Sequence, residues 1–325
     1  MGGSIRRLLF RTFAAAGGDR LWWKRGSGDL RILCYHGVCE DRLAAAEWVP
    51  SYFVTQSAFE KQLQYLQRFA SVLPLGEAVE KLVEGTLPPR SVSLTFDDGY
   101  ANNLTLAYPL LRRYGIPATI FLSTACVESG DHFPFLKLKL IQLNGHTGSD
   151  RFAAKLLEYK TNPLDAVLES AEPWWSEVSG SLSGGQEETL RPMTIDDVKA
   201  ADGSLIEFGA HGHTHCILKN ESPQRRQEEI RTSVRKVAEW TGRPTRLFSY
   251  PNGGHGDFDD TDKETLRAES IRAAVSGIAG TNDDRSDLLE LRRYPVGIHH
   301  DEAGFRAEVS GFRTALLAAS GRMEP

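Results

Sequence analysis

Three histidines, His211, His213 and His215, stand within five residues of one another. They follow a short apolar run, 205–208, that is typical of a β-strand. Because His211 and His215 are four positions apart, one helical turn would place both on one face, where two imidazole nitrogens can reach one metal ion. His213 would then point elsewhere. Solvent-facing or hydrogen-bonded histidines are the alternative, but this spacing beside a strand end favours a metal site.

Two adjacent carboxylates, Asp97 and Asp98, come directly after a strongly β-branched and aromatic run, 92–96. Gly99 allows the chain to turn sharply there. Adjacent side chains diverge, so one carboxylate can bind a metal while the other takes a proton from water held by that metal. On its own the pair would be read as an Asx turn or a helix N-cap. Together with two histidines, one carboxylate completes a ligand set of catalytic zinc sites.

A third candidate is the turn 249–254, which contains Tyr250, Pro251 and Asn252 and ends in two glycines. Backbone amides in such a turn can face a developing oxyanion. An ordinary connection between two elements explains the same residues equally well.

The elements that must position these residues alternate between short apolar runs and helical periodicity from about residue 31 onward. This alternation predicts βα units and a largely parallel sheet. A helix with Phe59, Leu63 and Leu66 on one face is expected to be capped by Ser57. The predicted strands are 32–35, 92–96, 118–122, 205–208, 247–250 and 273–275. In parallel α/β folds, sites form at the carboxyl ends of strands, where Asp97 and His211 fall.

The composition restricts the class of protein. The 325 residues include 38 Lys and Arg against 43 Asp and Glu, a formal net charge of −5, and 41% are hydrophobic. These values are typical of a soluble globular protein and exclude disorder. The sequence has no cluster of basic residues of the kind that binds phosphate groups, so we expect no nucleic-acid partner. The four cysteines form no CxxC pair and are expected to be buried free thiols: Cys34, Cys39, Cys126 and Cys216.

Three segments flank or interrupt the βα pattern. Residues 1–30 begin with a basic amphipathic leader, in which Arg6, Arg7 and Arg11 stand among apolar residues. The leader can lie on an anionic membrane surface or pack on the domain, and both readings are open. Residues 130–192 are predicted to be an insertion of helix and loop that ends in a flexible polar run, 179–186. Residues 301–325 are expected to be a helix and a fraying tail, and no segment is apolar enough to span a membrane.

Three motifs stand in order along the chain: Leu94-Thr95-Phe96-Asp97-Asp98-Gly99-Tyr100, then His211-Gly212-His213-Thr214-His215, then Tyr250-Pro251-Asn252-Gly253. In this order they resemble the first motifs of the polysaccharide deacetylases, which are carbohydrate esterase family 4 or the NodB homology domain. The segments 32–38 and 117–122 are similar to the same family. The resemblance therefore covers about residues 31–300.

The resemblance implies an α/β fold, a distorted (β/α) barrel of seven strands, and removal of acetyl groups from polysaccharides with a divalent metal, most often zinc. Asp98, His211 and His215 match the family's metal ligands, and Asp97 matches its general base. The turn around Tyr250 and Asn252 would then contribute to oxyanion or substrate binding.

Two family features are missing. The usual arginine two positions before the proline of the third motif is Ser249 here. Arg293 can replace it as the charge partner of Asp97, although a surface arginine is an equal alternative. No late histidine matches the usual general acid. His36, in a Tyr-His dipeptide like that of the poly-N-acetylglucosamine deacetylase branch, is the candidate acid, and a core histidine is the alternative.

The favoured function is therefore a metal-dependent hydrolase that removes N-acetyl groups from an N-acetylglucosamine-containing polysaccharide or oligosaccharide. Its partner would be an acetylated glycan used in exopolysaccharide synthesis. An O-acetyl esterase, a cyclic-amide hydrolase and an inactive glycan-binding barrel are the alternatives. The expected location is the cytoplasm, at the inner face of the membrane if the leader binds there, with the cell envelope or the exterior as the alternative.

Overall fold

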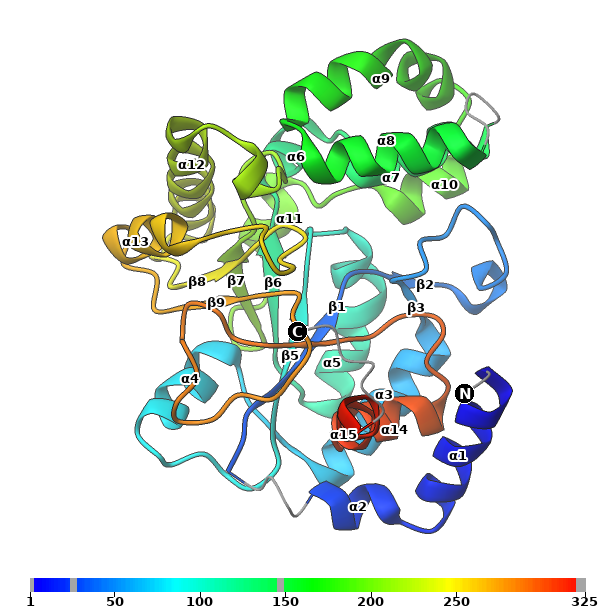
Figure 1. Ribbon diagram of the computed structural model, residues 1–325, viewed down its shortest axis with the longest axis vertical. Coiled ribbons are helices and arrows are strands. Elements are labelled where there is room, and N and C mark those ends of the chain that lie inside the picture. Colours follow the sequence, from blue (N-terminus) through cyan, green and yellow to red (C-terminus); the bar gives the residue numbers. More distant parts are fainter. Residues whose placement is uncertain (1–2, 24–27, 145–148, 320–325) are drawn as a thin grey trace.

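The fold is organised around one parallel sheet. The computed structural model describes residues 3–23, 28–144 and 149–319, and within these ranges seven strands follow one another in the order β10-β1-β5-β6-β7-β8-β9. They curl into a half-barrel surrounded by helices (Figure 1), which confirms the predicted distorted (β/α) barrel. The strands of this sheet are β1 (Arg31–Tyr35), β5 (Ser91–Phe96), β6 (Ala118–Leu122), β7 (Ile206–Ala210), β8 (Leu247–Ser249), β9 (Ala273–Val275) and β10 (Tyr294–Pro295).

Three further strands are short. β4 (Ser71–Val72) pairs with the first residues of β5, while β6 pairs with the last residues of β5. β2 (Val38–Cys39) and β3 (Val54–Thr55) form a separate parallel pair. The start of β5 is thus held by β4 and its end by β6, which fixes the direction in which β5 delivers the residues that follow it.

A segment near the carboxyl end of the chain connects β9 to β1. Leu291 donates its N–H to the carbonyl of Ala274 in β9 at 2.9 Å and accepts the N–H of Ser276, the residue after β9, at 2.8 Å. Three residues later Tyr294 pairs with Leu33 of β1. We call residues 288–296 the strap, because they bridge the open side of the sheet.

Helices cover the outside of the sheet and one end of it (Figure 1). The insertion forms helices of its own, α7 to α10, which gather at one end of the molecule. The helices are α1 (Gly3–Ala15), α2 (Gly18–Trp23), α3 (Gln56–Phe69), α4 (Leu75–Val83), α5 (Tyr108–Tyr114), α6 (Thr124–Ser129), α7 (Pro134–Leu143), α8 (Ser149–Thr161), α9 (Leu164–Ser179), α10 (Gly184–Leu190), α11 (Ile195–Ala200), α12 (Pro223–Thr241), α13 (Asp260–Ala268), α14 (Glu302–Val309) and α15 (Phe312–Ala319).

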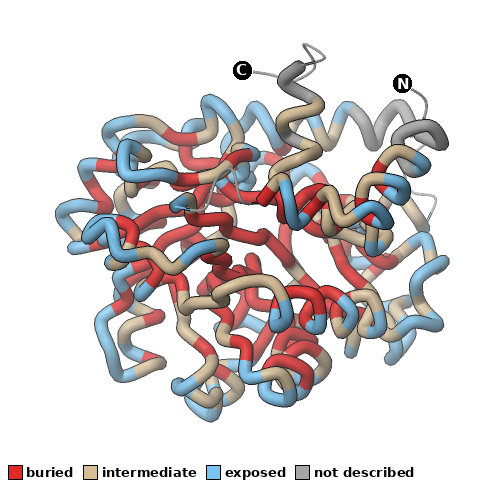
Figure 2. Tube along the Cα trace, turned by 90° about the horizontal axis from the view of Figure 1, so that it is seen from below, coloured by how far each residue is buried: buried red, intermediate tan, exposed pale blue. Residues whose placement is uncertain are grey.

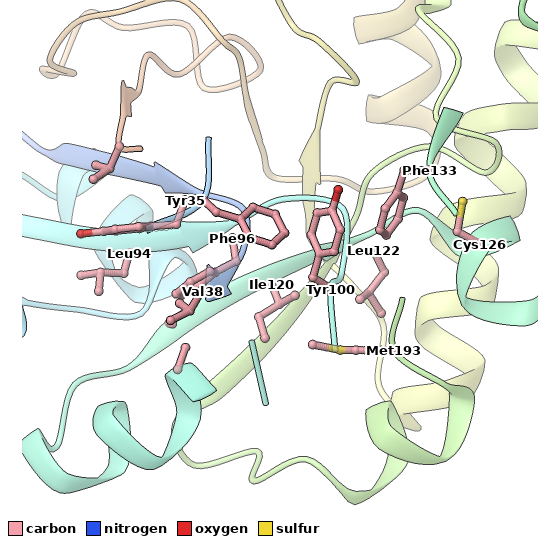
Figure 3. Packing of buried hydrophobic residues seen from close by; sticks show 14 of the residues in the cluster. Tyr35, Val38, Leu94, Phe96, Tyr100, Ile120, Leu122, Cys126, Phe133 and Met193 are labelled. Atoms are coloured by element: carbon pink, nitrogen blue, oxygen red, sulfur yellow. The ribbon is translucent and has the colours of Figure 1, made fainter. Parts of the chain in front are cut away.

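The central strands are buried along their whole length, as expected for a parallel sheet covered on both faces. All six residues of β5 and all five of β6 are buried. Figure 2 shows the buried residues gathered in the middle of the molecule and the exposed ones on its outer turns. In Figure 3, Phe96, Ile120 and Leu122 of β5 and β6 pack beside Tyr100 and Phe133. This apolar packing holds rigid the strand end that carries Asp97.

The structure corrects three local predictions. Helix α3 is capped by Thr55, whose hydroxyl accepts the N–H of Ala58, while Ser57 lies inside the helix. The polar run 179–186 is not a flexible loop, because Ser183 and Gln186 form a reciprocal capping box that starts α10. The third prediction, a helical turn at His211–His215, fails at the site described below.

The leader packs against the C-terminal helices. The Phe13 and Phe312 rings stack at 3.7 Å between centroids, and Arg306 donates to the Ala14 carbonyl at 2.9 Å. Buried Asp19 receives a further hydrogen bond from Arg306 at 3.0 Å. The side chains of Arg6 and Arg7, and residues 320–325 of the tail, lie outside the described residues. Among the described helices, none has the length and apolarity needed to cross a bilayer.

Candidate active site

Asp97 and Asp98 lie in a sharp turn at the carboxyl end of β5. Asp98 has a φ of 74° and Gly99 a φ of 92°, both in the left-handed region. A Cβ atom on Gly99 would also stand only 2.7 Å from Leu122 Cδ2. The turn therefore needs glycine at position 99, and it aims the two carboxylates in different directions.

Asp98 faces two histidines. Its Oδ1 lies 3.4 Å from His211 Nε2 and 3.2 Å from His215 Nε2. All three ligand atoms lie within 4.8 Å of one another, close enough to hold one metal ion. The histidines come from a loop after β7 rather than from a helical turn, since Gly212 has a φ of 71° and His215 a φ of 64°. The structure thus brings the predicted ligands together but corrects the backbone that carries them.

The donor set fits a metal ion. The Asp98 Oδ1 atom is buried and has no hydrogen-bond partner, although an unpaired buried carboxylate oxygen is costly. Each imidazole has its other nitrogen engaged: His211 Nδ1 lies 2.7 Å from the Ser249 carbonyl and His215 Nδ1 lies 2.9 Å from the Tyr159 hydroxyl. With Nδ1 as the donor in both rings, both Nε2 lone pairs are directed at the atom that Asp98 leaves unpaired.

The loop that carries the histidines is held by Glu229 of α12, which is 1% exposed. Its carboxylate accepts the N–H groups of His213 and Thr214, both at 2.8 Å, and the Thr214 hydroxyl at 2.9 Å. The His213 ring turns away from the candidate metal ligands, as predicted, and its Nδ1 lies 2.8 Å from the Thr124 hydroxyl. Glu229 therefore fixes the backbone between the two candidate ligands.

Asp97 is paired with Arg293 of the strap. The guanidinium donates to Asp97 Oδ1 at 2.7 Å and to Oδ2 at 2.6 Å, and both residues are buried. Arg293 also donates to the Ser249 hydroxyl at 3.1 Å and to the Ser276 carbonyl at 2.8 Å. Arg293 is therefore the charge partner of Asp97. The surface-arginine alternative is excluded.

Both carboxylates are ionised at neutral pH. Burial alone would raise the pKa of Asp97, but Arg293 and His211 outweigh burial and hold the pKa well below its ordinary value. For Asp98, burial is likewise outweighed by the adjacent imidazoles of His211 and His215, which lower its pKa. Asp97 is thus available to accept a proton, and Asp98 is available to bind a cation.

His36 follows β1 at the same edge of the sheet. Its ring lies 4.7 Å from that of Tyr52, and its buried Nδ1 atom has no hydrogen-bond partner. Burial lowers the pKa of His36, and the nearby carboxylates Asp98 and Asp97 oppose that shift. The imidazole is therefore neutral at pH 7 and must be protonated before it can act as an acid.

The structure corrects the expectation for Tyr250. Its hydroxyl donates to the Leu289 carbonyl at 2.8 Å, its backbone N–H donates to Val275 at 3.1 Å, and its ring stacks on Phe258. Neither donor is free for an oxyanion. The side chain of Asn252 is exposed and donates to Asp257 at 2.6 Å. A role for the backbone of Asn252 stays a prediction.

Sequence reasoning missed two contacts with the site. Tyr159, on α8 of the insertion, reaches His215, and burial raises the pKa of its hydroxyl well above the ordinary value, so it stays a phenol. The Cys34 thiol lies 3.6 Å from Asp97 Oδ2. All four cysteines are buried and free, as predicted. A tyrosine in a weakly periodic insertion carries no sequence signal of such a contact.

The barrel and this arrangement of carboxylates, histidines and arginine define a class of hydrolase. A family profile, polysaccharide deacetylase, matches residues 84–271, more than half of the chain. The chain therefore belongs to the polysaccharide deacetylase family.

Individual relatives of the chain have names that specify a substrate. The poly-beta-1,6-N-acetyl-D-glucosamine N-deacetylase of Staphylococcus epidermidis is 37% identical over 88 residues, which is 27% of this chain and 30% of the relative. That of Staphylococcus aureus is 38% identical over 85 residues, 26% of this chain and 29% of the relative. The chain thus matches less than a third of the length of these curated relatives.

Solved structures share the fold. The deacetylase PplD of Streptococcus pyogenes, in complex with acetate, aligns with a TM-score of 0.61 at 18% identity over 86% of this chain and 98% of that chain. IcaB of Ammonifex degensii aligns with a TM-score of 0.58 at 20% identity over 88% of this chain and 98% of that chain. At such low identity these alignments establish the fold alone.

Proposed function

We propose that this protein is a metal-dependent hydrolase that removes N-acetyl groups from an N-acetylglucosamine-containing polysaccharide or oligosaccharide. The observation that carries the proposal is the placement of a buried, arginine-paired carboxylate, Asp97, beside the unpaired Asp98 oxygen and two imidazoles. Such a site can hold a cation and a proton acceptor side by side. The names of the staphylococcal relatives favour a β-1,6-linked polymer as the substrate.

The residues have separate roles in the proposed reaction. Asp98, His211 and His215 would hold a divalent metal such as Zn²⁺, which would supply Lewis-acid polarisation of the acetyl carbonyl. Asp97 takes a proton from the attacking water, and Arg293 keeps its carboxylate ionised and fixed in orientation. His36, once protonated, gives a proton to the departing amine. Water adds to the carbonyl carbon, the C–N bond breaks, and acetate and a glucosamine unit leave.

The experiment that tests the proposal is acetate release from N-acetylglucosamine oligomers. Zinc-loaded wild type should release acetate, and chelated wild type should not. Asp97→Asn keeps the shape of the side chain but cannot accept the proton, so we expect a loss of about 10²- to 10⁴-fold in kcat with zinc content unchanged. Zinc-loaded wild type that cleaves O-acetyl esters or cyclic imides but no oligomer would refute the substrate assignment. A chain that binds no zinc would refute the mechanism.

Membrane contact is a separate prediction. Helix α1 leaves Leu8 exposed at 67% while its opposite side packs against α14 and α15. We propose that the enzyme is cytoplasmic and that α1 rests on the inner face of the membrane. Sedimentation with anionic and with neutral vesicles tests this, and equal recovery with both would contradict it.

A further inference from the structure

The insertion reaches the metal site through one side chain. The Tyr159 hydroxyl lies 2.9 Å from His215 Nδ1 and also donates to the His215 carbonyl at 3.3 Å. Tyr159 is 4% exposed. Because its hydroxyl can accept one hydrogen bond and donate another, it holds both the ring and the backbone of the same residue.

His215 needs such a partner more than His211 does. Its φ of 64° lies in the left-handed region, where a residue with a Cβ atom is strained. Its ring must also carry the proton on Nδ1 if the Nε2 lone pair is to bind a metal beside Asp98. For His211 the Ser249 carbonyl on a barrel strand provides the acceptor, whereas for His215 the acceptor comes from outside the barrel.

The insertion is itself fastened to the segment that follows His215. Glu221 accepts the N–H of Leu164, at the start of α9, at 2.7 Å. The Asn220 amide lies 3.5 Å from the Tyr159 carbonyl, and Arg225 lies 3.9 Å from Asp165. The position of Tyr159 over His215 is therefore supported by contacts at its own backbone and at the start of α9.

We propose that Tyr159 is a positioning residue of the metal site, which selects the Nδ1–H tautomer of His215 and fixes its ring, so that the insertion is part of the active site. The inference rests on the metal site of the proposed function. Removing an outer hydrogen-bond partner of a metal-binding histidine costs about 10- to 100-fold in metal affinity.

The test is the Kd for Zn²⁺ of Tyr159→Phe, measured by competition with a chromogenic chelator, together with the Tm of the zinc-free protein. The Phe ring preserves packing against Phe135, 6.3 Å away. Tyr65→Phe is the matched control, since Tyr65 is also buried and its hydroxyl donates to Asp19 at 2.7 Å. We expect Kd to rise about 10- to 100-fold for Tyr159→Phe and to stay at the wild-type value for Tyr65→Phe.

The remaining outcomes of this experiment distinguish failure of the inference from failure of the proposed function. A Tyr159→Phe protein that loses Tm but keeps the wild-type Kd, or that fails to fold, would show a purely structural role and overturn the inference. Tight zinc binding without deacetylation in wild type would refute the proposed function while leaving the Kd comparison valid, and wild type without zinc binding would overturn both. Imidazole nitrogen NMR of the zinc-loaded wild type gives a second readout, in which Nδ1 of His215 should be protonated and protected from exchange. An unprotonated Nδ1 would overturn the inference.

Discussion

The bond between Asp97 and Arg293 carries the clearest quantitative prediction. Arg293→Met keeps an apolar stem of similar length and removes both hydrogen bonds to the carboxylate. Asp97 and Arg293 are only 3% and 2% exposed, so the variant leaves an uncompensated buried charge. We expect a loss of about 3–5 kcal/mol in the free energy of unfolding at neutral pH, measured by denaturant titration.

The loss should depend on pH with a defined sign. In wild type the pKa of Asp97 is depressed, so Asp97 stabilises the fold above its unfolded pKa of about 3.9 and loses this contribution as the pH falls toward its folded pKa. In Arg293→Met, burial is no longer opposed by the guanidinium and raises the folded-state pKa. The difference in unfolding free energy between the two proteins should therefore be largest at neutral pH and shrink as the pH falls through that raised pKa.

Measurements of kcat distinguish a role of Arg293 in the active site from a role in stability alone. Arg226 makes a comparable pair between α12 and α13, donating to Asp262 at 2.8 Å and to Asp259 at 2.6 Å. Arg226→Met should lose stability but keep the wild-type kcat of the folded protein. Arg293→Met should lose kcat by about 10²- to 10⁴-fold, because Asp97 is misplaced and partly protonated. An Arg293→Met enzyme with kcat within threefold of the Arg226→Met enzyme would refute the reasoning.

Two further predictions concern the general acid and the histidine loop. His36→Gln should lower deacetylation of N-acetylglucosamine oligomers by about 10²-fold or more, yet barely change hydrolysis of an aryl acetate, whose leaving group departs without a proton. Equal losses on both substrates in steady-state assays would exclude His36 as the acid. Glu229→Leu removes the acceptor of two N–H groups in the loop between His211 and His215, so thermal and denaturant unfolding should show a loss of at least about 2 kcal/mol, with weaker zinc binding by chelator competition. Unchanged zinc affinity in that variant would show that the ligands are positioned without this carboxylate.

The sequence predicted that the candidate metal ligands lie together because their convergence depends only on topology. β5 and β7 are parallel strands separated by β6 alone, so residues that follow their carboxyl ends lie close together whatever the local backbone is. The prediction of the local backbone conformation, a helical turn, was wrong. A four-residue spacing is equally compatible with a helical turn and with a loop, and the left-handed conformations of Gly212 and His215 decide for the loop.

Other contacts depend on tertiary packing that no local pattern encodes. Arg293 could be a surface residue or a partner of Asp97 until the path of the strap was known. Tyr250 was assigned to the site because it adjoins the turn, but successive side chains of a strand point to opposite sides. Since Ser249 faces Asp97, Tyr250 turns into the core instead.

The strap has a consequence for the order of events during synthesis and folding. Asp97 and Arg293 are 196 positions apart, so during synthesis the carboxylate leaves the ribosome long before its partner exists. A fully buried Asp97 without that partner would be strongly unfavourable, and the nascent sheet must therefore stay hydrated around the end of β5. The segment that pairs with β9 and β1 is also the one that brings the guanidinium to Asp97. Closure of the open side of the sheet and neutralisation of the buried carboxylate therefore depend on the same residues, and a chain ending before residue 293 would lack the partner of Asp97.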